Sequence, residues 1–227
     1  MVETQEQTRY APGRPSMDEI AERQERLMTT AASVFMELGF AGSSMGEIAR
    51  RAGVSKNTIY ARYATKTELF SGVMRWRADR LLPRFTRTLL TDQGLETTLQ
   101  TFGEGLLEVV LEPESMAFRR RMISEAVHFP EIAREYWSLG PARSRKLLGE
   151  YLQTQALAGA IVLRDPHLAA TEFIALIQGD FVIRAELGIE PAPAPEKRVA
   201  VVRGAVQLFL GAYGAPAPGQ QRELLSD

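Results

Sequence analysis

Apolar residues recur at the spacing of one helical face along most of the 227-residue chain. The first such stripe runs from Ile20 to Leu38, with apolar residues three, four or seven positions apart. Ser16 and Glu19 have the spacing of a capping box, which satisfies the free N–H groups at a helix start. Gly39 can end the helix, because glycine readily adopts the left-handed conformation found at helix C-termini. A first helix is therefore predicted from about residue 16 to 38.

Three further helix starts follow at short intervals. Ser44, Ser55 and Thr65 can each accept a hydrogen bond from the first turn of the helix that follows. Gly53 is a stop between two of these starts, and Pro83 ends or kinks the last helix. The predicted helices cover residues 45–52, 56 to about 63, and 66 to about 82.

The helical pattern of apolar residues continues to about residue 213. Two apolar stripes, at 95–110 and 118–129, precede three predicted helices at 131–160, 167–188 and 196–213, with prolines between the last three. Alternation of period two is not sustained anywhere, so no sheet is expected. The predicted fold class is all-α.

Composition narrows the class of protein. Hydrophobic residues make up 45% of the chain and no apolar run approaches the length of a membrane span, so no membrane contact is expected. The chain has no cysteine, which excludes disulfides, thiolate zinc sites and a cysteine nucleophile. With no export signal at the N-terminus, the expected location is the cytoplasm.

The net charge of −1 argues mildly against nucleic-acid binding, because phosphate neutralisation supplies most of that affinity. The local distribution is different. Between Arg50 and Lys66 the chain carries Arg50, Arg51, Lys56, Arg62 and Lys66 and no acidic residue. This compact basic segment coincides with the second and third predicted helices.

The segment from Ser44 to Tyr63 reads SMGEIARRAGVSKNTIYARY and has the features of a helix-turn-helix. Ile48 and Ile59 can bury between the two helices, and Ala49 is small enough for their close approach. Gly53 can adopt a positive φ at the turn, and Val54 can fill the corner. The alternative is a helical hairpin that does not bind DNA.

The outer face of the third helix carries side chains suited to a major groove. Lysine and arginine donate to guanine, asparagine pairs with adenine, and an alanine methyl can meet that of thymine. The Ser55-capped helix start is the end that faces DNA in this motif. The candidate base-reading residues are Lys56, Asn57, Thr58, Ala61 and Arg62. The candidate phosphate contacts are Ser44, Tyr60, Tyr63, Thr65 and Lys66.

These motifs resemble those of the TetR family of repressors over residues 16–75. The resemblance includes the stretches AASVFMELGFAGSSMGEIA, AGVSKNTIY and ARYATKTELFSGV, in that order. Residues 118–187 also resemble the C-terminal domain of the AefR-like branch. The resemblance implies an N-terminal three-helix DNA-binding domain and a C-terminal helical domain that binds a ligand and dimerises.

The resemblance also implies roles for individual residues. Lys56, Asn57, Thr58 and Ala61 would read bases, whereas Ser44, Tyr60, Arg62 and Lys66 would hold phosphates. Arg14, in the motif GRP, would reach the adjacent minor groove; the alternative is a free charge on a disordered arm. Many family members have an aromatic residue at the position of Ala61 and a histidine at that of Arg62, so the operator sequence does not carry over.

The expected domains are a flexible arm at 1–15, the helix-turn-helix domain at 16–64, a regulatory and dimerisation domain at 65–213, and a tail at 214–227. Two protomers are expected to pair through the last two long helices, because two recognition helices must reach successive major grooves. A largely apolar effector would bind inside the regulatory domain and release the DNA. Its predicted pocket residues are Phe102, Leu106, Phe118, Met122, Phe129, Phe173 and Ile177.

Several other features allow two interpretations. The run Arg119–Arg121 fits a solvated helix face better than a DNA or acidic-ligand contact. His128 and His167 fit surface or capping positions better than a metal site. The pair Tyr136 and Trp137 fits core or interface packing better than a ligand pocket.

Asp180 and Arg184, one helical turn apart, fit an ion pair at the dimer interface better than an effector contact.

Two other function classes remain as alternatives. An enzyme is not favoured, because the chain has no paired nucleophile and base, no glycine-rich phosphate loop and no metal-ligand cluster. No metal and no cofactor are expected. An activator or scaffold that binds DNA without a small effector would be favoured by a regulatory domain with no cavity.

Overall fold

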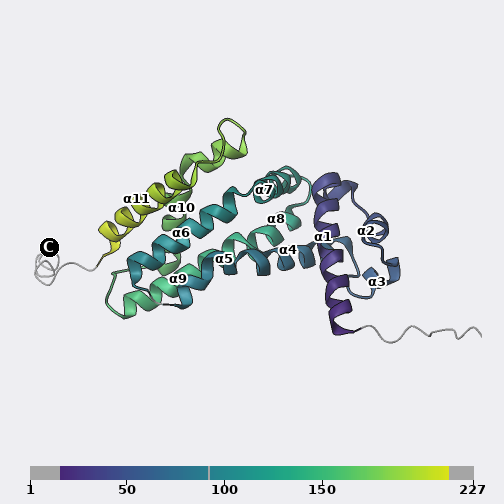
Figure 1. Ribbon diagram of the computed structural model, residues 1–227, viewed down its shortest axis with the longest axis horizontal. Coiled ribbons are helices and arrows are strands. Elements are labelled where there is room, and N and C mark those ends of the chain that lie inside the picture. Colours follow the sequence, from purple (N-terminus) through teal and green to yellow (C-terminus); the bar gives the residue numbers. More distant parts are fainter. Residues whose placement is uncertain (1–15, 92, 215–227) are drawn as a thin grey trace, which may run out of the picture. The chain divides into compact units, whose positions relative to one another are not determined.

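The structure is a computed structural model that describes residues 16–91 and 93–214 (Figure 1). Within these ranges the elements are helices, with one isolated bridge between Ile161 and Gly214 and no strand, so the all-α prediction is confirmed. No helix of the described part is long and apolar enough to cross a membrane. The predicted arm with Arg14, and the tail beyond Gly214, lie outside the described residues.

Contacts divide the chain into two compact units, one ending at Lys66 and one beginning at Thr67. The first unit contains α1 (Met17–Gly42), α2 (Met45–Ala52) and α3 (Lys56–Tyr60). In Figure 1 the two short helices lie beside the long α1. The core of this unit is built from one face of α1 and the inward residues of α2 and α3.

The start of α1 has the predicted capping box. Glu19 N–H donates to Ser16 Oγ over 3.1 Å, and Ser16 N–H donates to the Glu19 carboxylate over 2.9 Å. Its end differs from the prediction. Gly39 adopts φ 74° and interrupts the regular helix, but a further turn continues to Gly42. The predicted stop is therefore a kink, because nothing after Gly39 prevents the backbone from coiling again.

The third helix is shorter than the predicted 56–63. Regular helix ends at Tyr60. The carbonyl of Ile59 then accepts hydrogen bonds from the N–H groups of both Arg62 and Tyr63, at 3.0 and 2.9 Å. The chain thus stays coiled as a tight turn through Ala61 and Arg62, and the outer face of α3 continues into this turn.

The second unit begins within α4 (Lys66–Leu81), which Pro83 ends as predicted. The elements after it are α5 (Pro83–Thr86), the 3-10 turn η1 (Arg87–Leu90), α6 (Leu95–Leu111), α7 (Pro113–Ala126), α8 (Pro130–Leu139), α9 (Pro141–Leu157), α10 (Pro166–Glu186) and α11 (Pro195–Tyr213). Six of these helices have proline in the first turn, where its missing N–H would be unpaired in any case.

The predicted helix over 131–160 is wrong as one element. Gly140, at φ −114° and ψ −91°, separates α8 from α9, and Pro141 opens α9. Proline inside a helix removes one hydrogen bond and clashes with the carbonyl four residues earlier, so the chain restarts there. The Gly140–Pro141 pair was the sequence signal for this break.

The core of the second unit lies among α6, α10 and α11, which run alongside one another in Figure 1. Phe173 on α10 packs against Phe102 and Phe209, with ring centroids 6.4 and 5.3 Å apart. A Cβ added to Gly103 would lie 2.6 Å from a Val202 methyl. Glycine at 103 therefore permits the close approach of α6 and α11.

Candidate DNA-binding surface and ligand cavity

The corner between α2 and α3 is packed as the sequence predicts. Ile48 and Ile59 are fully buried and Ala49 is 3% exposed. Gly53 adopts φ 66° and ψ 32°, and Val54 N–H donates to Ala49 O over 3.0 Å. These contacts hold the short α3 at a fixed angle to α2, which five residues of isolated helix could not achieve.

The outer face of α3 is exposed to solvent. Ser55 Oγ accepts from Thr58 N–H over 3.0 Å and lies 2.8 Å from Thr58 Oγ1, so the cap is formed. The exposed candidate residues are Lys56, Asn57, Thr58, Tyr60, Ala61 and Arg62. Ser44, also exposed, accepts from Glu47 N–H over 3.1 Å and caps α2. A polar, donor-rich surface is therefore presented by one rigid corner.

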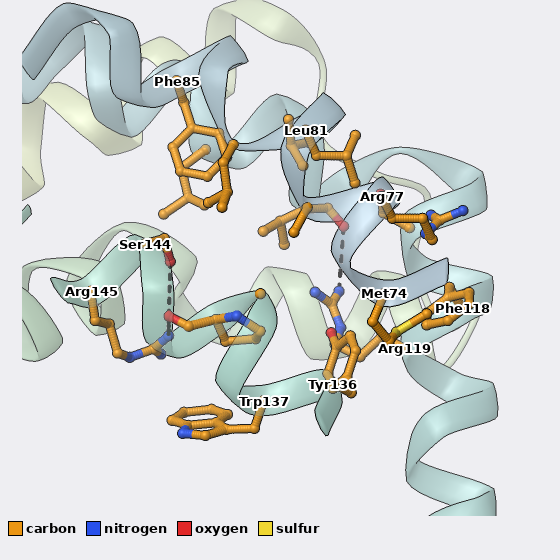
Figure 2. Close-up of a pocket in the computed structure, with 18 of the residues that line it drawn as sticks. Met74, Arg77, Leu81, Phe85, Phe118, Arg119, Tyr136, Trp137, Ser144 and Arg145 are labelled. Atoms are coloured by element: carbon orange, nitrogen blue, oxygen red, sulfur yellow. Dashed lines mark hydrogen bonds between the residues drawn. The ribbon is translucent and has the colours of Figure 1, made fainter. Parts of the chain in front are cut away.

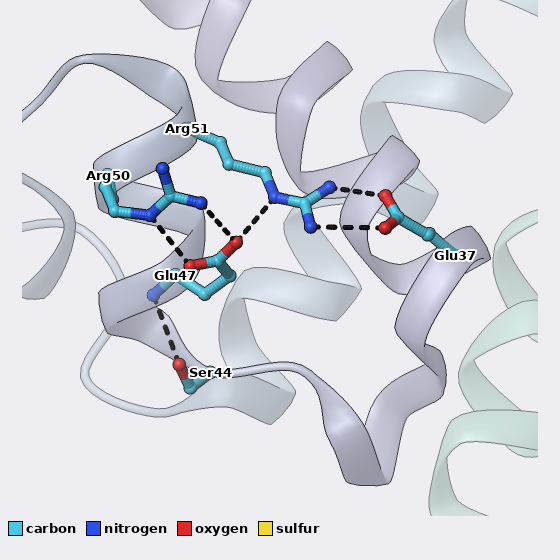
Figure 3. Close-up of polar contacts among 5 residues, drawn as sticks. All are labelled: Glu37, Ser44, Glu47, Arg50 and Arg51. Atoms are coloured by element: carbon cyan, nitrogen blue, oxygen red, sulfur yellow. Dashed lines mark hydrogen bonds and ion pairs between the residues drawn. The ribbon is translucent and has the colours of Figure 1, made fainter.

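Two arginines of the basic segment are neutralised by acids that lie outside it in sequence (Figure 3). Glu47 accepts from Arg50 over 2.7 and 3.0 Å and from Arg51 over 2.6 Å. Arg51 also bridges to Glu37 on α1. Between Arg50 and Lys66 the unit is therefore less cationic than the sequence indicates, since the fold supplies the missing carboxylates.

Three other candidate DNA-binding residues, at the end of this segment, form hydrogen bonds to α1 or to the residue that follows it. Arg62 donates to the side-chain carbonyl of Gln24, whose amide donates to Tyr63 Oη over 3.2 Å. Lys66 Nζ lies 2.5 Å from Phe40 O and 2.9 Å from Ser43 O, at the end of α1. A cation beside a helix C-terminus is favourable, so Lys66 supplies the positive charge that the last turn of α1 lacks.

The ion pairs of Glu47 with Arg50 and Arg51 predict that replacing Glu47 destabilises the protein at neutral pH but much less at acid pH. Hydrogen bonds from Arg50 and then from Arg51 lower the pKa of Glu47 from 4.5 to about 2. A depressed pKa means that Glu47 stabilises the fold fully above pH 4.5, and that this contribution is lost as the pH falls towards 2.

Glu47→Gln is expected to lower the urea midpoint at neutral pH, and the difference from wild type should shrink as the pH falls from 4.5 to about 2. Glu22→Gln controls for the loss of a surface charge. An equal difference in urea midpoint between Glu47→Gln and wild type at every pH would contradict this prediction.

The second unit contains a cavity of about 390 Å³ (Figure 2). Its walls come from α4 to α10 and are mainly apolar, with Met74, Leu81, Phe85 and Val109 among them. This volume lies within the range of about 300–1,000 Å³ usual for small-molecule pockets.

Of the seven predicted pocket residues, Leu106 and Phe118 line the cavity. The others do not, and four of them are buried in the packed interior. Helical periodicity identifies inward faces, but it does not tell which inward side chain meets a void and which meets another side chain. The predicted residues that do not line the cavity are Phe102, Met122, Phe129, Phe173 and Ile177.

Tyr136 and Trp137 line the cavity rather than only packing in the core, contrary to the favoured interpretation. Tyr136 lies 6.1 Å from the Phe118 ring, and its burial raises the pKa of its hydroxyl. Trp137 is 52% exposed, so this end of the cavity lies near the surface. The guanidinium of Arg145 stacks over the Trp137 ring at 4.8 Å.

The arginine run is not the solvated face that the sequence favours. Arg119 bridges to the buried Glu186 on α10, and Arg120 donates to Glu186 O over 3.1 Å. Only Arg121 forms the expected pair within its helix, with Glu125 at 3.3 Å. The run therefore joins α7 to the end of α10, and Arg119 also lines the cavity.

The remaining candidates take structural positions. Asp180 and Arg184 pair at 3.4 Å on the exposed side of α10. His167 stands in the first turn of α10, where Asp165 accepts from its N–H over 2.8 Å. No group of three potential metal-ligating side chains occurs among the described residues.

Comparison with known proteins identifies both units. Residues 97–215 match the C-terminal domain of AefR-like transcriptional repressors, and residues 27–73 match the tetR family of bacterial regulatory proteins. The chain belongs to the TetR family of transcriptional regulators. Its two matched regions, in this order, confirm the family resemblance drawn from the helix-turn-helix motifs. Because members of this family are regulators, the prediction that the chain is not an enzyme is also confirmed.

Individual relatives are distant. The chain is 30% identical over 112 residues to the transcriptional activator FasR of Mycolicibacterium smegmatis, and 27% identical over 114 residues to the regulator SrpR of Pseudomonas putida. These matches cover 49% and 50% of this chain, and only 51% and 52% of the two relatives. The flavonoid-responsive regulator FrrA superposes with a TM-score of 0.78 at 27% identity, covering 87% of this chain and all of that one.

Proposed function

We propose that this TetR-family protein is a repressor that binds a palindromic operator as a homodimer and releases it when a small effector binds. The observation that carries the proposal is the solvent-exposed outer face of α3, held rigid by the buried Ile48 and Ile59 within the family's DNA-binding unit. Its Lys56 and Asn57 are the types that read guanine and adenine in a major groove. Such a protein acts where chromosomal DNA lies, in the cytoplasm.

Dimerisation is supported by an unpartnered apolar face on α10 and α11. Leu176, Ile183 and Leu208 are 41%, 48% and 66% exposed. At Gly204 and Gly211 an added Cβ would meet no atom within 4 Å. Large exposed apolar side chains beside small residues allow close helix crossing with a twofold mate. A dimer is also required to place two recognition helices about 34 Å apart on one face of DNA.

Release by an effector is supported by the course of α4. This helix starts at Lys66, where the first unit ends, and its residues Met74 and Leu81 line the cavity. A ligand that binds better to one position of α4 shifts the population towards that position and changes the spacing of the two recognition helices. The structural neighbour FrrA is flavonoid-responsive, and on this likeness we extend effector control to the present chain.

The test is selection of bound fragments from genomic DNA, followed by retardation of the selected site. Asn57→Ala is expected to cost about 1–3 kcal/mol of discrimination at one base pair per half-site. Lys56→Ala should weaken binding and lower its salt dependence if Lys56 contacts phosphate instead. Lys146→Ala, the same change on the second unit, is the control and should leave retardation unchanged.

Selection of no sequence above background, or base discrimination by the Asn57→Ala variant that equals that of wild type at every position of the selected site, would contradict the proposal. FasR is named as a transcriptional activator, and this supports a second candidate function for the chain, that of an activator with the same DNA-binding unit. Expression of a reporter placed behind the selected site distinguishes the two, because deletion of the protein raises expression under a repressor and lowers it under an activator.

A further inference from the structure

The cavity of the second unit has an uncompensated positive charge. Its wall contains three arginines, Arg77, Arg119 and Arg145, and no acidic residue. Arg77 pairs with Glu114 and stacks on Phe118 at 4.5 Å, and Arg119 pairs with the buried Glu186. Arg145 has no such carboxylate among the described residues. The wall with its paired acids therefore carries a net charge of +1.

Arg145 is also incompletely hydrogen-bonded. Its Nη1 donates to Pro141 O over 2.9 Å, but its Nε is buried and has no partner in the described part of the chain. Burial lowers the pKa of this guanidinium, which opposes its charge where no anion is bound. A buried donor of a charged group is costly to leave unpaired, so the arrangement favours an acceptor supplied from elsewhere.

The surroundings of Arg145 suit an anion. Figure 2 shows Arg145 beside Ser144, with Trp137 below its guanidinium, at the end of the cavity away from Phe118. Gly140 and Pro141, also on the wall, form the start of the 17-residue α9. This helix start has no acidic residue in its first turn and no side-chain cap, so its positive dipole end is unbalanced.

We propose that the cavity selects an organic monocarboxylate, with its apolar body among Met74, Leu81 and Phe85 and its carboxylate at Arg145. One negative charge balances the single unpaired guanidinium. The planar guanidinium fork fits a carboxylate, and stacking on Trp137 holds the fork in place. A cation would meet a wall with a net positive charge, and a neutral ligand would leave the charge of Arg145 without a counter-charge. This inference rests on the proposed function, because it identifies the chemistry of the effector.

The test measures ligand binding without DNA. Trp76 and Trp137 are the two tryptophans of the chain. Trp76→Phe therefore leaves Trp137, which lines the cavity, as the sole tryptophan, whose fluorescence is excited selectively over that of tyrosine. The probes are decanoate, decanamide and decylamine, with trans-cinnamate and cinnamamide as an aromatic pair. Each carboxylate is expected to bind about tenfold to a hundredfold more tightly than its amide, and decylamine most weakly.

Variants assign this preference to Arg145. In the Trp76→Phe background, Arg145→Met keeps an apolar stem of similar length and should abolish the preference for carboxylate over amide. Arg145→Lys should keep part of it, because the charge remains but the fork is lost. The matched control is Arg143→Met, which removes an arginine two residues away that pairs with Asp79 at 2.8 Å outside the cavity wall. The control should keep the full preference.

Equal binding of decanoate and decanamide, retention of the preference in Arg145→Met, or its loss in Arg143→Met would overturn the inference. So would failure of both carboxylates to bind in the millimolar range. If Arg145→Met does not fold, the comparison of carboxylate with amide in the parent protein still decides. A neutral ligand that binds and releases operator DNA would overturn this inference alone. A carboxylate that binds without affecting DNA retention would overturn the proposed effector control alone.

Discussion

Replacement of Leu208 by aspartate is expected to lower operator affinity by about 100- to 10,000-fold while leaving both units folded. Leu208 is 66% exposed on α11, beside Gly204 and Gly211, on the face through which we propose that two protomers pair. Burying an unpaired carboxylate in that interface is strongly unfavourable, whereas in a monomer the same carboxylate remains in water. Operator affinity falls because, in a monomer, binding of one recognition unit no longer holds a second unit at high effective concentration beside the other half-site.

Light scattering coupled to size-exclusion chromatography measures the first effect, and retardation of the full operator and of a half-site measures the second. Leu157→Asp is the matched control, since Leu157 is 84% exposed and lies at the end of α9, not on α10 or α11. It should behave as wild type in both experiments. A dimeric Leu208→Asp protein, or a monomer with unchanged operator affinity, would show that α11 does not form the interface.

Removal of Arg119 is expected to cost about 3–5 kcal/mol in the free energy of unfolding. The Glu186 side chain is 8% exposed and that of Arg119 is 19% exposed, so Arg119→Met leaves a buried carboxylate without its partner. Arg119 also donates to Val110 O over 3.4 Å, and this contact is lost in the same variant. The double variant Arg119→Met with Glu186→Leu should recover much of the loss, because neither charge then remains buried.

Urea unfolding of the two single variants and the double variant forms a double-mutant cycle. Arg143→Met is the comparison, because its pair with Asp79 has both side chains about half exposed and such pairs contribute about 0–1 kcal/mol. If Arg119→Met costs no more than Arg143→Met, or if the double variant is as unstable as the sum of the single variants, the Arg119–Glu186 pair is not coupled in the way that the geometry implies.

Local signals in the sequence determine the helix-turn-helix. The capping box at Ser16 and Glu19 and the positive φ at Gly53 depend on interactions within a few residues, so they are readable without a fold. The burial of Ile48 and Ile59 follows from helical spacing in the same way. The break at Gly140 and Pro141 had an equally local signal, which the apolar pattern of the surrounding residues obscured.

Tertiary structure alone decides which charges remain free. Arg51 and Lys66 look equally available in the sequence, yet Glu37 neutralises one and the end of α1 holds the other. Arg119 looks like part of a solvated run, but it pairs with a residue 67 positions later. Such contacts depend on how distant helices pack, which no short-range pattern encodes.

The sequence by itself thus determined the all-helical fold, the helix caps at Ser16, Ser44 and Ser55 and the exposed face of α3, because each of these depends on neighbours within one or two turns. The tertiary structure decided where the cavity lies and that Tyr136, Trp137 and Arg145 form part of its wall. The reason is that a cavity is the space left between several helices, and its position depends on packing between residues far apart along the chain.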